Sequence, residues 1–195
     1  MRAARAGGSR STLCEDADVD RAVARLEGEL VGRLIPDLSF QATARGAVQL
    51  SDAALGDFVL FIYPRISRPD EPGATEWVLI PGARGCTAES CVFRDLADDF
   101  HTLGLSIYGL STQDSAEQLE AAERLHLTYP LLSDPELELG RALGLSTFHF
   151  EGRDLYKRST LVVRRSSIVA AQLEVSNGPA HPYELLAQLG RGADR

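Results

Sequence analysis

The apolar residues of this chain fall into short continuous runs and into longer runs spaced by three or four residues. Two continuous runs, residues 58–63 (FVLFIY) and 105–110 (LSIYGL), consist mainly of β-branched, aromatic and leucine side chains. Runs of this length and composition are typical of strands buried on both faces of a sheet. Pro64 ends the first run, because proline cannot donate a hydrogen bond to a strand ladder. The sequence therefore predicts two central strands.

Shorter segments bounded by turn residues predict further strands, including two hairpins. They are residues 36–50 with a turn at Arg45 and Gly46, residues 131–132, and residues 158–165 and 168–175 with a turn at Ser166 and Ser167. Residues 145–157 are expected to form only a connection.

Apolar residues at helical spacing predict five helices. They are residues 16–33, with Val19, Val23, Leu26 and Leu30 on one face, residues 86–103, residues 115–127, a short helix ended by Gly144, and residues 182–189 with Pro182 in the first turn. We expect the first helix to lie against the domain or to serve an oligomer contact.

This order of elements predicts an α/β, thioredoxin-like fold with an N-terminal β-hairpin extension and an extra N-terminal helix. Residues 1–14 are expected to be a disordered tail, residues 15–33 the helix, and residues 34–190 the domain. Residues 65–82 form a long loop rich in proline and glycine. Trp77 and the apolar residues after it indicate that this loop packs down, and disorder is the alternative.

Composition narrows the class of partner. The chain has 195 residues and a net charge of -8, which argues against nucleic acid or an anionic membrane surface. No apolar run is long enough to span a bilayer, and no apolar leader segment follows the basic start. Three cysteines are too few for a disulfide framework and suit a reducing cytoplasm.

The candidate chemistry lies in GCTAESC, where Cys86 begins a predicted helix and Cys91 follows five residues later. A thiol at a helix N-terminus faces free N–H groups and the positive end of the dipole, which favours the thiolate. The alternative is a pair of inert buried cysteines. Cys14, in the predicted tail, is either a bystander or a rival to Cys91.

A metal site is not expected from this sequence. Zinc would need two ligands beyond the cysteines, and no histidine pair in the domain has the spacing typical of zinc ligands. The histidines concerned are His101, His126 and His149.

The motifs VLFIYP, GCTAESCVFRD, YPLLSDP and RSTLVV resemble those of peroxiredoxins, most closely the Q-type or bacterioferritin-comigratory branch, over about residues 34–190. The resemblance implies that Cys86 attacks peroxide, Cys91 resolves the product into a disulfide, and Arg158 reaches the thiolate from a later strand. Candidates for substrate binding are Gly85, Thr87 and Glu89.

The same resemblance implies a peroxide substrate, a reductant such as thioredoxin or glutaredoxin, no cofactor, and a monomer or homodimer. For Arg158, the alternative from the residues alone is an ordinary surface cation at the start of a strand.

Two departures from that family pattern precede Cys86. Ala83 stands where the family has a Thr or Ser hydroxyl, and Arg84 replaces a usual proline. The strand-ending Pro64 lies well before the cysteine because residues 65–82 intervene, and Pro81 is a candidate substitute.

The missing hydroxyl favours one rival function, a thioredoxin-fold thiol/disulfide oxidoreductase or redox sensor with little peroxidase activity. A second rival is a catalytically silent binding protein that uses the loop around Trp77 as its interaction surface.

Helix geometry places a condition on any Cys86–Cys91 disulfide. Five residues of α-helix separate two Cα atoms by about 8.6 Å, beyond the roughly 7 Å that a disulfide spans. We therefore expect oxidation to unwind the first one to two turns, through about residue 94.

Overall fold

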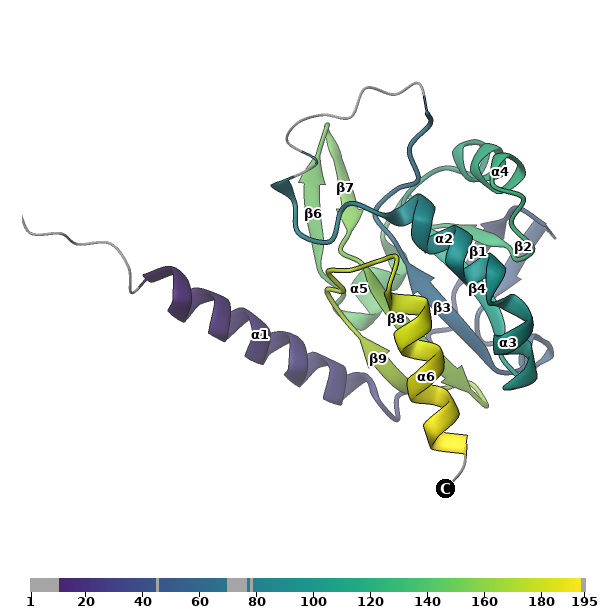
Figure 1. Cartoon of the computed structure of the whole chain (residues 1–195), viewed down its shortest axis with the longest axis horizontal. Helices are drawn as coiled ribbons and strands as arrows, with labels where there is room; N and C mark the ends of the chain where they lie inside the picture. The colour runs from purple at the N-terminus through teal and green to yellow at the C-terminus, as the bar shows by residue number, and fades with distance from the viewer. Residues whose placement is uncertain (1–10, 45, 70–76, 78, 194–195) are drawn as a thin grey trace, which may run out of the picture.

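A central mixed sheet organises the domain, with helices on both faces (Figure 1). The computed structural model describes residues 11–44, 46–69, 77 and 79–193, and of these it describes the side chains between residues 19 and 191. The seven strands follow the order β2-β1-β5-β4-β3-β8-β9. They are β1 Ser39–Ala42, β2 Gly46–Gln49, β3 Phe58–Ile62, β4 Ser106–Ser111, β5 Leu131–Ser133, β8 Ser159–Arg164 and β9 Ser167–Gln172.

The predicted central strands are confirmed. β3 pairs in parallel with β4 and antiparallel with β8, and all five of its residues are buried. Because strand side chains alternate between faces, Phe58, Leu60 and Ile62 enter one core cluster while Val59 and Phe61 enter the other. This α/β arrangement, with the β1–β2 hairpin added beyond β5, is the expected thioredoxin-like fold.

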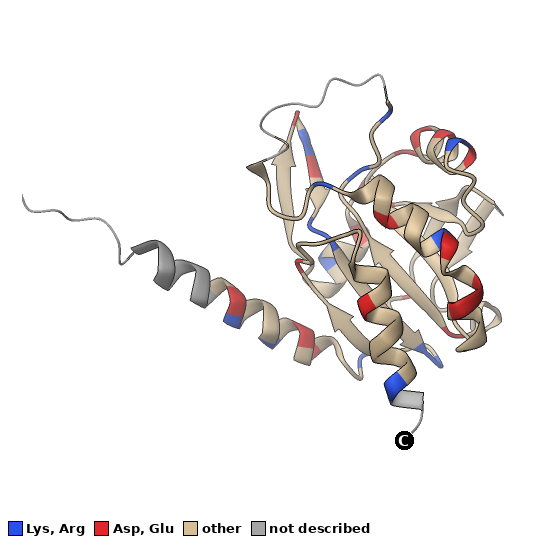
Figure 2. Ribbon diagram, in the orientation of Figure 1, with Lys and Arg blue, Asp and Glu red and all other residues tan. Residues whose placement is uncertain are grey.

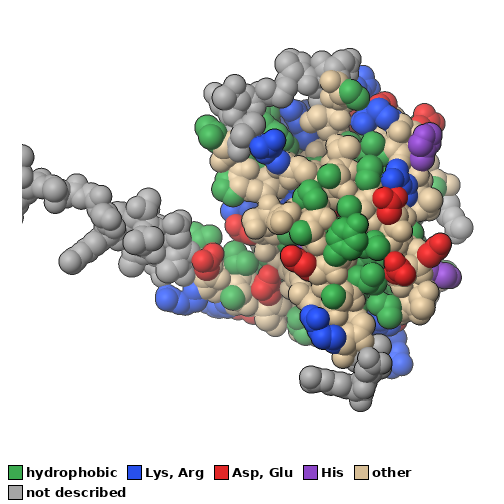
Figure 3. All heavy atoms as spheres, viewed as in Figure 1, with side chains coloured by type: hydrophobic (Ala, Val, Ile, Leu, Met, Phe, Trp, Pro, Cys, Tyr) green, Lys and Arg blue, Asp and Glu red, His purple; other side chains and the backbone are tan. Residues whose placement is uncertain are grey.

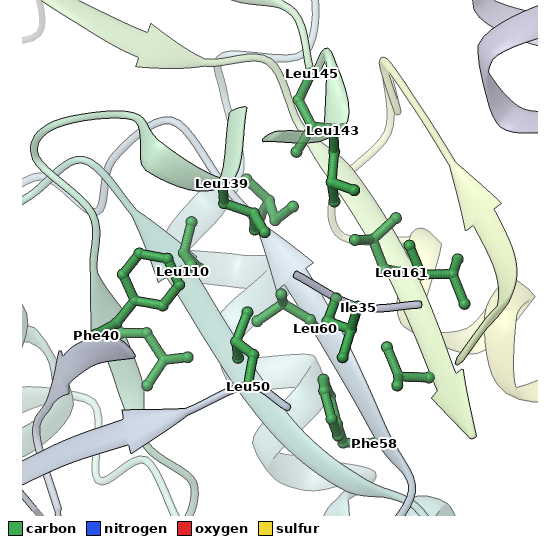
Figure 4. Close-up of a cluster of buried hydrophobic side chains, with 14 of the residues drawn as sticks. Ile35, Phe40, Leu50, Phe58, Leu60, Leu110, Leu139, Leu143, Leu145 and Leu161 are labelled. Carbon is green, nitrogen blue, oxygen red and sulfur yellow. The ribbon is translucent and has the colours of Figure 1, made fainter. Parts of the chain in front are cut away.

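One core cluster lies between the sheet, the β1–β2 hairpin and the short helix α5 Glu138–Leu143 (Figure 4). Its buried side chains are almost entirely leucine, isoleucine, valine and phenylalanine, and Leu30 from the end of the first helix joins it. Burial of such side chains contributes roughly 1.5–3 kcal/mol each. This face carries no cysteine among its buried members and supplies stability.

The opposite cluster contains Cys86 and is rich in aromatic rings. Phe93 stacks on Phe61 with ring centroids 4.4 Å apart, and Tyr129 meets Phe61 edge-on at 5.6 Å. The helices over this face are α2 Cys86–Asp95, α3 Ala97–Thr102, α4 Ser115–Arg124 and α6 His181–Ala193. The candidate nucleophile therefore sits in the ordered interior.

The predicted continuous helix over residues 86–103 is wrong in one respect. The structure has two helices, α2 and α3, which meet at Leu96 with φ -98° and ψ 7°. Phe93 and Phe100 are both fully buried on either side of this break. Residues seven apart lie on nearly the same face of an uninterrupted helix as well, so the apolar spacing did not reveal the break.

The expectation that residues 145–157 form only a connection is also wrong. They form a separate antiparallel hairpin, β6 Thr147–Phe150 and β7 Arg153–Tyr156. Trp77 packs against Phe148 and Phe150 of β6, with ring centroids 6.0 and 4.9 Å away, so this part of the long loop packs as predicted. The rest of the prediction for the loop at residues 65–82 concerns largely residues 70–76 and 78, which lie outside the described residues.

The first helix, α1 Ser11–Leu30, begins inside the range expected to be a tail. Its C-terminal end is anchored to the domain: Leu30 is fully buried, and Glu27 accepts a hydrogen bond from Leu173 N–H at 2.7 Å. The remainder projects from the domain (Figure 1), with charges of both signs along its described part (Figure 2). Residues 1–10 and the Cys14 side chain lie outside the described residues. None of the described helices is long and apolar enough to cross a membrane.

α6 is fastened to the sheet by its first residue. His181 Nε2 lies 2.9 Å from Thr160 Oγ1 on β8, and the ring stands edge-on to Phe93. Burial, and then the charge of Arg158, lower the pKa of His181 to about 4. The ring is therefore neutral at physiological pH.

This burial predicts a loss of stability in mild acid. The unfolded imidazole takes up a proton near its ordinary pKa of 6.5, whereas the folded ring does so only near 4. Stability should therefore fall between those pH values, by up to about 3 kcal/mol once the folded ring is also protonated. Urea unfolding across this range should show a steeper acid loss for the natural chain than for His181→Gln. Equal losses in the two proteins would refute it.

Candidate active site

Cys86 is the first residue of α2, and its position depends on the glycine before it. Gly85 is the N-cap residue, in the left-handed region with φ 89°. There a Cβ atom would also lie 2.8 Å from Pro179 Cδ. The first N–H groups of a helix lack intrahelical partners, so the first turn directs free donors towards the region of the sulfur. Cys86 itself is only 3% exposed.

Arg158 is the residue directly before β8, and its side chain reaches the sulfur of Cys86. Its Nη2 lies 3.2 Å from Cys86 Sγ and also donates to the carbonyl oxygens of Gly82 at 3.1 Å and Arg84 at 2.9 Å. The Arg158 side chain is fully buried. The alternative that Arg158 is a surface cation is therefore wrong.

Glu89, one turn into α2, forms an ion pair with the Arg158 guanidinium, and neither side chain has exposed surface. Two charges buried together in this way stabilise each other's ionised forms, whereas an unpaired buried charge is strongly destabilising. Glu89 was predicted to bind substrate. Its buried contact with Arg158 instead suits holding the guanidinium in place.

The segment before α6 closes over the other side of the guanidinium. Val175 N–H donates to the Arg158 carbonyl at 2.9 Å. A Cβ atom at Gly178 would lie 2.7 Å from Arg158 Cζ, so only glycine leaves room for the guanidinium as it stands. Val175, Gly178, Pro179 and His181 were not identified from the sequence. The Gly-Pro pair at 178–179 marked a turn, but nothing local indicated what the turn covers.

Ala83 contributes a carbonyl where a hydroxyl was expected. Its side chain is buried, and its carbonyl oxygen lies 3.4 Å from Cys86 Sγ, within reach of a thiol hydrogen. Arg84, which replaces the usual proline, is exposed but supplies its carbonyl to Arg158. The backbone of residues 82–84 thus surrounds the sulfur and its cation.

Cys91 is not brought into contact with Cys86. Both are free thiols on one uninterrupted helix, Cys86 buried and Cys91 half-buried. Thr87 and Gly85 are half-buried at the start of the same helix, so their backbone is close to the sulfur. The structure therefore unites Cys86, Arg158 and Glu89 and leaves Cys91 apart.

The face that carries α2 and α6 has a hydrophobic middle with charged side chains around it (Figure 3). Exposed large apolar residues include Leu79, in the turn before α2, and Tyr183 on α6. Within the described part of the chain, no group of three or more His, Cys, Asp or Glu side chains could hold a metal ion.

Comparison with known proteins bears directly on this arrangement. A family model described as Redoxin matches residues 30–189. Peroxiredoxin bcp1 of Schizosaccharomyces pombe is 31% identical over 115 residues, which is 58% of this chain and 51% of that protein. Peroxiredoxin Bcp of Bacillus subtilis is 30% identical over 112 residues, 57% of this chain and 62% of that protein. The chain thus spans between half and two thirds of these relatives.

Solved structures extend the match. Peroxidoxin BcpB of Mycobacterium tuberculosis superposes with a TM-score of 0.66 at 28% identity, covering 83% of this chain and 96% of that one. The bacterioferritin comigratory protein of Xanthomonas campestris, described with alkyl peroxide reduction activity, superposes with a TM-score of 0.66 at 23% identity, covering 84% of this chain and 99% of that one. By the family model and these relatives, the chain belongs to the Redoxin family, among peroxiredoxins of the Bcp and Q type.

Proposed function

We propose that this chain is a thiol-dependent peroxidase that reduces hydrogen peroxide or alkyl hydroperoxides through Cys86. The observation that carries the proposal is the 3.2 Å contact between Arg158 Nη2 and Cys86 Sγ at the start of α2. A buried guanidinium and a helix N-terminus both favour the thiolate, which is the reactive form of cysteine. The alkyl peroxide activity named for the Xanthomonas campestris protein supports the wider substrate range.

In the first step the Cys86 thiolate attacks one oxygen of the peroxide. The O–O bond breaks, the departing oxygen takes a proton and leaves as water or an alcohol, and Cys86 becomes a sulfenic acid. Arg158 Nη2 and the free N–H groups from Gly85 to Thr87 are placed to stabilise the developing charge. Glu89 positions Arg158 and has no exposed surface for substrate.

In the second step the Cys91 thiolate attacks the sulfur of that sulfenic acid. An S–S bond forms, the hydroxyl leaves as water after protonation, and an external dithiol carrier such as thioredoxin or glutaredoxin reduces the disulfide. The cycle uses no cofactor. Its need for a dithiol reductant supports a reducing cytoplasmic location.

The alternative is a thiol/disulfide oxidoreductase or sensor with little peroxidase activity, and Ala83 is the observation that favours it. Without a hydroxyl beside the sulfur, the peroxide loses one hydrogen-bonding group. Titration of free thiols after a stoichiometric dose of hydrogen peroxide separates the two functions. Rapid loss of two thiols identifies a peroxidase, and slow loss or none identifies the rival.

Replacement of the nucleophile is the first functional prediction. Cys86→Ser should abolish peroxide consumption, because a serine hydroxyl at this position is not ionised and cannot form a sulfenic acid. Cys14→Ser is the matched control and should consume peroxide at nearly the natural rate. Retained turnover in Cys86→Ser, measured by peroxide disappearance, would exclude the proposed mechanism.

The second functional prediction concerns removal or displacement of the Arg158 guanidinium. Arg158→Met should slow Cys86 oxidation by on the order of 100-fold, as loss of a preorganised donor does in other active sites. Gly178→Ala should slow it less but in the same direction, because the new methyl group would displace the guanidinium without removing its charge.

Gly190→Ala is the control for that glycine variant, since a Cβ there meets nothing within 4 Å. Stopped-flow measurement of the first oxidation phase gives the comparison. Equal rates in Gly178→Ala and Gly190→Ala would show that the placement of Arg158 does not limit the reaction.

A further inference from the structure

The disulfide step requires α2 to open, so the contacts that hold α2 in place enter its barrier. α2 is continuous from Cys86 to Asp95, and an ideal helix keeps Cα atoms five residues apart about 8.6 Å from each other. A disulfide needs them within roughly 7 Å. Any side chain that fastens the turn around Cys91 must release it before the thiols can join.

Two side-chain hydrogen bonds fasten that turn to the connection between α4 and β5. Tyr129 Oη donates to the Ser90 carbonyl at 2.8 Å, directly before Cys91. Arg94 Nη1 donates to the Leu125 carbonyl at 2.6 Å, three residues after it. Cys91 is therefore bracketed by two anchors that lead to the same connection.

Tyr129 is the more deeply buried of the two anchors. It is 7% exposed, and its ring meets Phe61 edge-on, so the phenol cannot follow the helix outward. Burial is the main cause of a pKa raised well above the ordinary value, so the hydroxyl stays protonated and remains a donor. The bond to Ser90 can persist only while that carbonyl keeps its helical position.

We propose that Tyr129, through its hydrogen bond to the Ser90 carbonyl, is a positioning residue that holds α2 folded and sets the rate at which Cys91 reaches oxidised Cys86. This rests on the proposed peroxidase function. A firmer anchor lengthens the life of the sulfenic acid. A second peroxide then has time to convert it to sulfinic acid, transferring one oxygen and leaving as water or an alcohol.

The test replaces the hydroxyl alone. Tyr129→Phe should form the Cys86–Cys91 disulfide about 2- to 10-fold faster, the range expected for losing one buried hydrogen bond from the closed state. It should also give less sulfinic acid at high peroxide, with the first oxidation rate unchanged. Rapid quenching, alkylation and mass spectrometry measure all three quantities.

Tyr156→Phe is the matched control. It removes a buried phenol hydroxyl that donates to Asp134 at 2.6 Å and accepts from Gly140 N–H at 2.8 Å, in the opposite core cluster. Its disulfide rate should equal that of the natural chain. Arg94→Met, which removes the other anchor, should accelerate disulfide formation as Tyr129→Phe does.

Hydrogen exchange in the reduced protein tests the anchor without peroxide. Amides of residues 90–95 should exchange 2- to 10-fold faster in Tyr129→Phe, as the lost bond implies, while those of β3 are unchanged. Equal exchange and equal disulfide rates would overturn the proposal, as would a uniform acceleration that includes β3. If neither the natural chain nor any of these variants loses thiols to peroxide, the proposed function fails. Hydrogen exchange in the reduced protein then still decides whether Tyr129 holds α2.

Discussion

The buried contact between the Arg158 guanidinium and Cys86 is the interaction on which the rest of the site depends. A guanidinium without exposed surface is strongly destabilising unless hydrogen bonds and an opposite charge surround it. Here two backbone carbonyls, Glu89 and the sulfur surround it. The Cys86 sulfur is one of the groups that satisfy the cation, so placement of the proposed nucleophile and burial of the charge are the same structural requirement.

That requirement explains features which local sequence does not. Gly82 adopts φ 73° and turns its carbonyl to the guanidinium, and Gly178 leaves the space that the guanidinium occupies. Burial, and then the charge of Arg158, lower the pKa of His181, so this ring stays neutral beside a permanent charge. These contacts fix together three segments that are distant in sequence. They are the segments before α2, before β8 and before α6.

Most of the fold could be predicted because sheet and helix burial follow strict periods. The strand at residues 58–63 was predicted from its continuous apolar run, and the hairpin around Gly46 from the alternation of apolar and polar residues. The β6–β7 hairpin was missed because Arg153–Tyr156 has two exposed residues followed by two buried ones and so shows no alternation. The break between α2 and α3 was missed because apolar spacing continues across Leu96.

The site was only partly predictable for a related reason. Cys86 and Arg158 could be named from motifs. Gly178 matters because it leaves room for the Arg158 guanidinium, and Tyr129 because its hydroxyl reaches α2, and only the folded chain makes these contacts. Spacing along the sequence contains no information about such contacts. Glu89 was predicted to bind substrate from the family resemblance, and its pairing with Arg158 becomes visible only in the folded chain, where both side chains are buried.

The helix α2 must be folded for the first step of the proposed cycle and open for the second. The contacts that hold it in place differ along its length. The N-terminal part of α2 is held mainly by polar contacts, chiefly the buried pair of Glu89 with Arg158 and the hydrogen bond from Tyr129 to the Ser90 carbonyl. Beyond it, Phe93 is fully buried and stacks on Phe61 at 4.4 Å, and expelling such a ring costs several kcal/mol. Opening of α2 up to Cys91 must therefore release these polar contacts, and opening from Phe93 onward would in addition expel a buried ring. The Phe93 ring thus opposes any spread of the proposed unwinding beyond the turns that carry the two thiols, and it protects the packing of the sheet beneath.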